Sequence, residues 1–295
     1  MLSIIDEYID MLAASGKSSA NTLSAYKTDI TGMVRFLNER GIDSYDRVTF
    51  TDLNAYVLEL EKNCASSSVS RKISSIKSFY DYLFDKGIVK DKPAKMLKAP
   101  RITRKKPDYI SQGQMGRLLD SATGDTPKHY RDKAMLEILY ATGIRTTELI
   151  SLKMSDINMG QQYITICDNG NGKVRMVPFG TQAKKALSQY FNYGRNVIAG
   201  DDEGYVFYNI QKKPLTRQGV WKIIKEYGDK CGLTDVLTPQ TFRNCFAMHM
   251  LENGADLKNV QELLGHDNIS TTQVYANYIS KPDAVVRYAD VHPRK

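Results

Sequence analysis

Five polar side chains have the types and the order that phosphodiester chemistry would need: Arg145, Lys173, Arg243, His266 and Tyr275. The transition state of phosphoryl transfer spreads negative charge over the non-bridging oxygens, and planar guanidinium groups match that geometry. A tyrosine phenol can attack phosphorus and form a covalent intermediate, which divides one difficult transfer into two easier ones. The lysine could protonate the departing 5′ oxygen. The residues therefore predict a phosphodiester site in which arginines take the place of a metal ion.

The same residues also have structural interpretations. Arg145 could pair with Glu148, Arg243 with a nearby carboxylate, and Lys173 could be a solvated turn residue. His266 could cap a helix, because cations are favoured at a helix C-terminus. The remaining histidines have no partner at ligand spacing and are expected to be structural: His129, His249 and His292.

Neither a metal nor another cofactor is expected. The sequence has no cluster of Asp and Glu of the kind that holds Mg²⁺. Its four cysteines form no C-x-x-C pair, which fits a reducing cytoplasm better than a disulfide framework. No apolar run approaches the roughly 18 residues of a membrane span, and acidic residues interrupt the apolar N-terminal stretch, so neither a membrane partner nor a signal peptide is expected.

Local signals predict the elements that position these side chains. In the N-terminal part, apolar residues at helical spacing predict four helices: near 4–12, from 18–21 to Gly41, near 51–60, and from 69 to Gly87. Farther on, a helix near 131–142 ends at Gly143, and strands at 163–166 and 174–177 flank a hairpin turn at 168–173.

Three further helix boundaries lie close to the candidate site. Thr238 can cap and Pro239 can open a helix that carries Arg243. Gly265 can close the next helix and leave His266 at the corner, and a helix that starts near Ser270 would carry Tyr275.

Basic residues are concentrated in one stretch of the chain. The formal net charge is +8, and the segment 71–106 alone holds twelve basic and three acidic residues. Its end, 98–108, has two prolines, five bases and no amphipathic period, which predicts a linker. Such a distribution suggests a polyanion partner, although a solvated surface explains most charge runs. The candidate DNA-binding residues are Arg71, Lys72, Lys77, Arg101, Arg104, Lys105 and Lys106.

Over essentially its whole length, the sequence resembles the tyrosine recombinase (phage integrase) family, most closely its Xer-type members. The segments that carry the resemblance are 21–26, 75–80, 251–256, 260–266, 270–275 and the tail 291–295. The resemblance implies that Tyr275 is the nucleophile and forms a 3′-phosphotyrosyl link to DNA. It also implies that Arg145, Arg243 and His266 hold the scissile phosphate. Because the phosphotyrosine stores the bond energy, no ATP is expected.

Three positions depart from the family pattern. Gln240 stands where the family usually has histidine, three residues before the second arginine, and Asn244 follows that arginine where histidine is common. Glutamine can donate a hydrogen bond to phosphate but cannot shuttle a proton. Gly170 stands where the family lysine commonly lies, so we assign that role to Lys173, the nearest lysine in the hairpin.

The expected fold is mainly α (α+β), forming a clamp around double-stranded DNA. A four-helix core-binding domain (1–98) and a basic linker (99–108) precede a mostly helical catalytic domain (109–295) with a small antiparallel sheet. The resemblance implies a tetramer on two DNA sites, joined through the segment after Tyr275. The apolar face of that segment would be formed by Ala284, Val285, Val286 and Tyr288.

Several alternatives remain open at this stage. The chain could be a DNA-binding relative that has lost catalysis and acts as a regulator, which Gln240 and Gly170 would favour. It could instead be a nicking enzyme similar to type IB topoisomerases. Chromosome-dimer resolution and mobile-element integration share the same chemistry, and the sequence does not separate them. It also leaves open the target sequence and whether a second recombinase or an accessory protein takes part.

Overall fold

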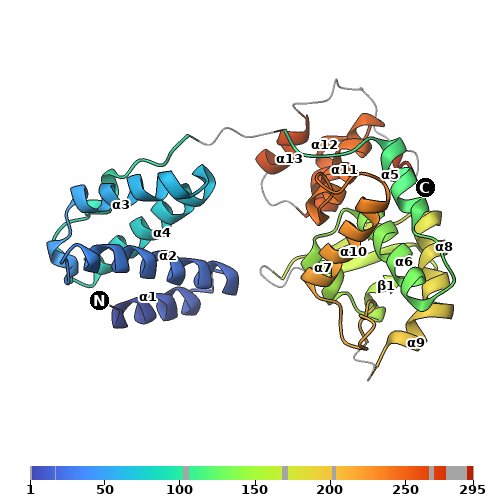
Figure 1. Ribbon diagram of the computed structural model, residues 1–295, viewed down its shortest axis with the longest axis horizontal. Coiled ribbons are helices and arrows are strands. Elements are labelled where there is room, and N and C mark those ends of the chain that lie inside the picture. Colours follow the sequence, from blue (N-terminus) through green and yellow to red (C-terminus); the bar gives the residue numbers. More distant parts are fainter. Residues whose placement is uncertain are drawn as a thin grey trace. The chain divides into compact units, whose positions relative to one another are not determined.

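The computed structural model divides the chain into two compact units, Met1–Lys105 and Lys106–Lys295 (Figure 1). The residues described are 2–16, 18–101, 106–167, 172–200, 204–265, 269–276 and 291–294. The boundary between the units lies inside the segment 99–108 that was predicted as a linker. Within the described residues, no helix is long and apolar enough to cross a membrane.

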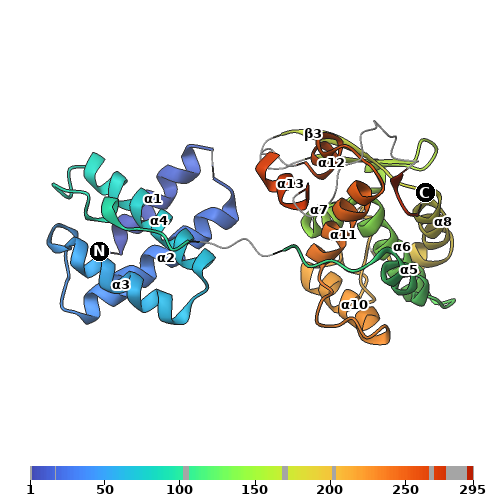
Figure 2. The ribbon, with the colours of Figure 1, turned by 90° about the horizontal axis from the view of Figure 1, so that it is seen from above.

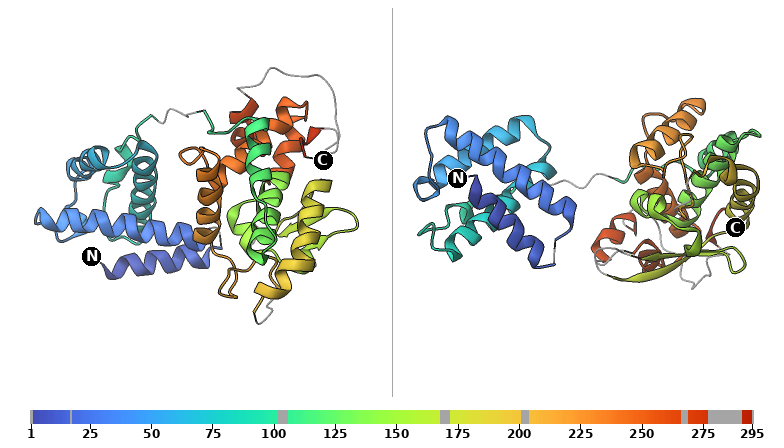
Figure 3. Two further views of the ribbon diagram at one scale, coloured as in Figure 1. Left: turned by 45° about the vertical axis from the view of Figure 1, so that its right-hand side comes forward. Right: turned by 90° about the horizontal axis from the view of Figure 1, so that it is seen from below.

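The first unit is a bundle of four α-helices among its described residues: α1 (Ser3–Ala14), α2 (Ala20–Glu39), α3 (Phe50–Asn63) and α4 (Ser66–Asp85). The prediction of four helices here is confirmed. α2 and α4 are followed by Gly41 and Gly87, both with positive φ, as expected for glycines just beyond a helix C-terminus. α4 begins three residues earlier than its first apolar residue indicates. α1 packs along α2 (Figure 3).

The second unit is built around α6 (Pro127–Thr142), which is buried from Ala134 to Thr142. A helix covered on every side cannot be amphipathic, so periodicity gives little help in locating it. α6 packs against α8 and α11 (Figure 1). The other α-helices among the described residues of this unit are α5 (Gln112–Ser121), α7 (Thr146–Ser151), α8 (Thr181–Tyr190), α9 (Asn196–Ile198), α10 (Arg217–Lys230), α11 (Pro239–Glu252), α12 (Leu257–Leu264) and α13 (Ile269–Ala276).

A small antiparallel sheet, in the order β1-β2-β3, completes the second unit. The two predicted strands are β2 (Tyr163–Cys167) and β3 (Val174–Pro178), and β1 (Ile157–Asn158) was not predicted. In the register Ile164 pairs with Val177 and Ile166 pairs with Arg175. Side chains alternate across a strand, so Arg175 faces the buried side of the sheet together with Val177. β3 lies beside α12 (Figure 2).

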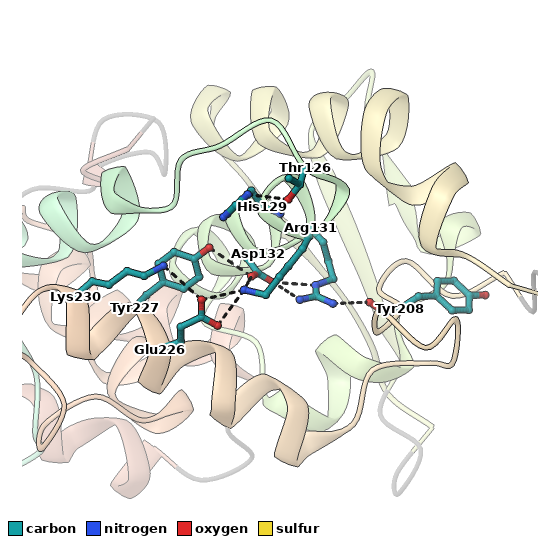
Figure 4. A network of polar contacts seen from close by, with 9 residues as sticks. Thr126, His129, Arg131, Asp132, Tyr208, Glu226, Tyr227 and Lys230 are labelled. Atoms are coloured by element: carbon teal, nitrogen blue, oxygen red, sulfur yellow. Dashed lines mark hydrogen bonds and ion pairs between the residues drawn. The ribbon is translucent and has the colours of Figure 1, made fainter.

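A buried polar network at the start of α6 fixes this helix to α10 and to the segment around residue 208 (Figure 4). The Arg131 guanidinium binds the Asp132 carboxylate at 2.5 and 2.8 Å and donates to the backbone carbonyl of Tyr208 at 3.2 Å. Lys128 bridges Asp132 and Glu226 at 3.3 and 2.9 Å. Every charge in this network has a partner, as buried charges require. The network is therefore part of the scaffold.

The tail residues Val291–Arg294 dock on the second unit of their own chain. His292 Nε2 donates to the Tyr140 carbonyl at 3.2 Å, since Nδ1 accepts from the Arg294 backbone N–H. Arg294 pairs with Glu137 at 2.5 and 3.0 Å, and Glu137 is only 1% exposed. The predicted apolar segment at 284–288 lies outside the described residues.

Candidate active site

Three arginines converge on the C-terminal end of α12. Arg175 Nε donates to the carbonyl of Leu263 at 2.9 Å, Arg243 Nη2 to Leu264 at 2.7 Å, and Arg145 Nη2 to Gly265 at 3.1 Å. Successive carbonyls at a helix C-terminus have no intrahelical partner and carry partial negative charge. The end of α12 therefore orients the three guanidinium groups without neutralising them.

One carboxylate holds two of these arginines. Glu148 Oε1 accepts from Arg145 and Arg175 at 2.9 Å each, and Oε2 accepts from Arg175 at 2.9 Å and from the Arg145 backbone N–H at 2.6 Å. Burial raises the pKa of Glu148, but the Arg175 guanidinium and the hydrogen bond from the Arg145 backbone outweigh it, so the net shift is downward. The ion pair between Arg145 and Glu148 that the sequence suggested is therefore present in the structure. Three guanidinium groups beside one carboxylate carry a formal charge of +2.

Two glycines let the chain turn tightly beside these groups. Gly143 and Gly265 both have positive φ, at 59° and 65°. A Cβ on Gly265 would lie 2.9 Å from Arg175 Nη1, and a Cβ on Gly143 would lie 2.5 Å from the Phe246 ring. Both glycines end helices, as predicted, and the Gly143 carbonyl also accepts from Arg243 Nη1 at 2.6 Å.

The exposure of the arginines differs. Arg243 is 5% exposed, whereas 14% of the Arg175 side chain and 40% of the Arg145 side chain are exposed. Burial, together with the nearby Arg145 guanidinium, lowers the pKa of Arg243 to about 10. Arg243 thus remains cationic at neutral pH, and both of its described donors bind neutral backbone carbonyls.

Tyr275 is 6% exposed and lies close to the arginine cluster. Its hydroxyl donates to Asn244 Oδ1 at 3.0 Å, and Asn244 is the residue after Arg243 on α11. Burial raises the pKa of Tyr275, and the Arg243 charge offsets this in part. Gln240 lies one turn earlier, where its Nε2 donates to the same Asn244 oxygen at 2.9 Å. The structure thus brings Arg145, Arg243 and Tyr275 into one region and connects Gln240 to Tyr275 through Asn244.

The structure says less about the other candidate side chains. Lys173 is exposed immediately before β3. His266 lies outside the described residues, directly after Gly265. In the described part of the chain, no group of three or more His, Cys, Asp or Glu side chains could hold a metal ion.

The DNA-binding candidates of the first unit have mixed surroundings. Arg71 and Lys72 both pair with Asp29, which is 1% exposed, and the Lys72 contact measures 3.0 Å. A buried carboxylate needs a cation beside it, so both side chains act as counter-charges to Asp29, and their contact with DNA stays a prediction. Lys77 is half-buried and Arg101 is exposed. Arg104 and Lys105 lie outside the described residues.

Lys106, the remaining DNA-binding candidate, belongs to the second unit. Its side chain is exposed, and Nζ lies 5.3 Å from the centre of the Tyr109 ring.

Sequence reasoning missed two features of the second unit. Arg175 could have been found from the sequence. It lies two residues before the apolar Val177, so both side chains are on the same face of the strand, and an arginine on a buried face needs an acidic partner. The exposed face of α10 was also missed: an open depression there is lined by Arg217, Gln218, Trp221 and Lys222.

Comparisons with known proteins place the chain in a family. Residues 5–87 match the phage integrase N-terminal SAM-like domain, and residues 108–280 match the phage integrase family. The chain is 40% identical to tyrosine recombinase XerC of Roseiflexus castenholzii, across 92% of this chain and 88% of that protein. It is 38% identical to tyrosine recombinase XerD of Oceanobacillus iheyensis, across 98% of both chains.

Solved structures share the fold. A XerH recombinase bound to difH substrate in a post-cleavage complex gives a TM-score of 0.75 at 16% identity, over 87% of this chain and 76% of that one. A lambda integrase dimer bound to a core site gives a TM-score of 0.73 at 16% identity, over 97% and 99%. The chain belongs to the phage integrase family. Within it, the chain is a site-specific recombinase of the Xer-like tyrosine type.

Proposed function

We propose that this recombinase cleaves and rejoins DNA strands through a 3′-phosphotyrosyl intermediate formed by Tyr275. The observation that carries the proposal is the cluster of Arg145, Arg175 and Arg243 at the end of α12. The buried Tyr275 phenol lies beside it and donates to Asn244, the residue after Arg243. A phosphate diester carries one negative charge, which this positively charged site would attract. We assign the scissile phosphate to Arg145 and Arg243.

In the chemical step, the phenol oxygen attacks phosphorus and loses its proton to solvent, while the bond between phosphorus and the 5′ oxygen breaks and the 5′ oxygen takes up a proton. Lys173 is our candidate for the proton donor, and His266 and Gln240 for hydrogen bonds to the phosphate oxygens. Rejoining reverses the step, with a 5′ hydroxyl attacking the phosphotyrosine. One phosphodiester is exchanged for another, so neither ATP nor a cofactor is part of this proposal.

Double-stranded DNA is the proposed partner, and the exposed face of α10 is part of the proposed contact. Arg217 and Lys222 are exposed there beside Trp221, which is 48% exposed. Each phosphate contact contributes about 0.9 to the slope of log affinity against log salt. The double variant Arg217→Ala/Lys222→Ala should therefore reduce that slope by about 2 in filter binding. Lys185→Ala, an exposed lysine on α8, should leave it unchanged, and an unchanged slope in the double variant would exclude α10 from the interface.

We further propose a tetramer on two DNA sites, joined through the segment after Tyr275. Support comes from the family resemblance and from the lambda integrase relative, which was solved as a dimer on DNA. The Xer-like tail favours chromosome-dimer resolution over mobile-element integration or excision. A second recombinase or an accessory protein would fit either role. A reducing cytoplasm, with the protein associated with the nucleoid, is the compartment we expect.

Covalent trapping tests the proposal. A DNA site is first selected from random duplexes bound by the Tyr275→Phe variant, and a nicked suicide duplex is then built on it. Wild type should form a protein–DNA adduct that resists denaturant, and Tyr275→Phe should form none. Tyr278→Phe, a matched change three residues away, should retain the adduct. Tight binding without any adduct in wild type would favour a DNA-binding regulator instead.

A further inference from the structure

The side-chain amide of Asn244 connects three parts of the second unit. Its Nδ2 donates to the backbone carbonyl of Asp108 at 2.9 Å. Its Oδ1 accepts from the Tyr275 hydroxyl at 3.0 Å and from Gln240 at 2.9 Å. Asn244 is 7% exposed, so these contacts are shielded from water. Because the carbonyl of Asp108 can only accept, the amide nitrogen must face it, and the amide oxygen must face Tyr275.

The backbone that fixes this orientation is itself held on α11. The Ile110 N–H donates to Cys245 Sγ at 3.3 Å, and His249 Nε2 donates to the Ile110 carbonyl at 2.9 Å. His249 Nδ1 in turn accepts from the Tyr140 hydroxyl at 2.9 Å. Asn244, Cys245 and His249 thus attach residues 108–110 along α11, and the Asn244 amide has a rigid anchor.

We propose that Asn244 is a positioning residue for the nucleophile. The inference rests on the proposed function of Tyr275. An amide oxygen is too weak a base to take the phenol proton, so this contact orients the hydroxyl without activating it. Before the attack, Asn244 holds the phenol proton and leaves the oxygen lone pairs free for phosphorus; the proton then passes to solvent as the bond to phosphorus forms. Orientation of this kind matters because a misplacement of about 1 Å can cost a hundredfold in rate.

A double-mutant cycle tests the contact without reference to activity. Unfolding of Asn244→Ala, Tyr275→Phe and the double variant is followed by the fluorescence of Trp221, the chain's one tryptophan, which lies on α10 of the same unit. A buried hydrogen bond should appear as a coupling of about twofold to tenfold in the unfolding equilibrium constant. The pair Asn244→Ala with Tyr190→Phe should show no coupling, because the Tyr190 hydroxyl binds Val206 instead. Absence of coupling between Asn244 and Tyr275 would overturn the proposal.

Adduct formation tests the positioning role. In single-turnover trapping at saturating protein, Asn244→Ala should form the adduct about tenfold to a hundredfold more slowly, with DNA affinity within twofold of wild type. The matched control is Asn158→Ala, which removes another asparagine–tyrosine contact, to Tyr163 at 3.3 Å, and should keep the wild-type rate. A rate for Asn244→Ala equal to or above wild type would overturn the proposal. Absence of an adduct in wild type would overturn the proposed function instead.

Discussion

Replacing Gly265 with alanine should displace Arg175 from the arginine cluster, and this steric effect can be measured separately from the cost of placing alanine at a positive φ. Gly265 has φ of 65° and Gly232, just beyond the C-terminus of α10, has φ of 67°. Alanine in this left-handed region costs about 1–2 kcal/mol at either position. A Cβ on Gly232 would meet nothing within 4 Å, whereas a Cβ on Gly265 would lie 2.9 Å from Nη1 and 3.1 Å from Cδ of Arg175. Gly232→Ala is therefore a matched control for Gly265→Ala.

The additional cost follows from what Arg175 must give up. Its guanidinium makes two hydrogen bonds of 2.9 Å to the Glu148 carboxylate and a third to the Leu263 carbonyl. Hydrogen bonds to a charged group contribute about 1.5–3 kcal/mol each, and the shift should weaken about one of them. Gly265→Ala should thus destabilise the second unit by about 2.5–5 kcal/mol, and Gly232→Ala by about 1–2 kcal/mol.

Denaturant unfolding followed by Trp221 fluorescence measures this difference, because Trp221 reports on the second unit. The adduct assay adds a second comparison, in which Gly265→Ala should lose activity well beyond Gly232→Ala under conditions where both proteins are folded. Equal destabilisation and equal adduct rates for the two variants would refute the assigned role of Gly265 in seating Arg175.

Three further predictions concern charge. Glu148→Gln leaves the arginine cluster without its carboxylate and should cost about 3–5 kcal/mol in denaturant unfolding, whereas Glu226→Gln, in a half-exposed pair, should cost less than about 1 kcal/mol. Burial lowers the pKa of His292 to about 4, from about 6.5 when unfolded. Between pH 6.5 and 4, His292 therefore binds a proton in the unfolded chain but not in the folded one. Up to about 3 kcal/mol of the stability present above pH 6.5 should be lost as the pH falls to 4. A pH series on His292→Gln should lack this loss. Deleting 291–295 removes Arg294 from the buried Glu137 and should lower the Tm of the second unit.

Each of these expectations has its own contradicting result. A Glu148→Gln protein as stable as wild type would show that the three arginines need no counter-charge. An identical pH dependence for wild type and His292→Gln would mean that the tail does not bury a neutral imidazole. An unchanged Tm after deletion of 291–295 would show that the pairing of Arg294 with Glu137 does not stabilise the second unit.

Structural features that depend on only a few neighbouring residues were predicted correctly. Glycines at 41, 143 and 265 mark helix ends because their positive φ is a local requirement. Thr238 and Pro239 open α11 as predicted, because a cap and a first-turn proline satisfy the helix start locally. The family pattern also predicted that Arg145, Arg243 and Tyr275 share one site, and the structure places the three residues in one region.

Long-range pairings were not predictable in this way. Arg175 was overlooked because its carboxylate lies 27 residues earlier and its carbonyl acceptor 88 residues later. The pairing of Lys72, a predicted DNA contact, with the buried Asp29 on α2 was missed because the two residues lie 43 positions apart in the sequence. The docking of His292 on Tyr140, 152 residues away, has no local signal either. Burial and pairing of charges depend on tertiary packing, which a single sequence does not display.

The central claim is that Tyr275 becomes covalently joined to a 3′ phosphate of DNA. Trapped adduct can be digested with nuclease and protease, and the nucleotide-bearing peptide identified by mass spectrometry, with the released strand tested for a free 5′ hydroxyl. We predict a nucleotide on Tyr275 and a 5′ hydroxyl on the released strand. A nucleotide on another residue, or a 5′ phosphate on the released strand, would contradict the proposed chemistry.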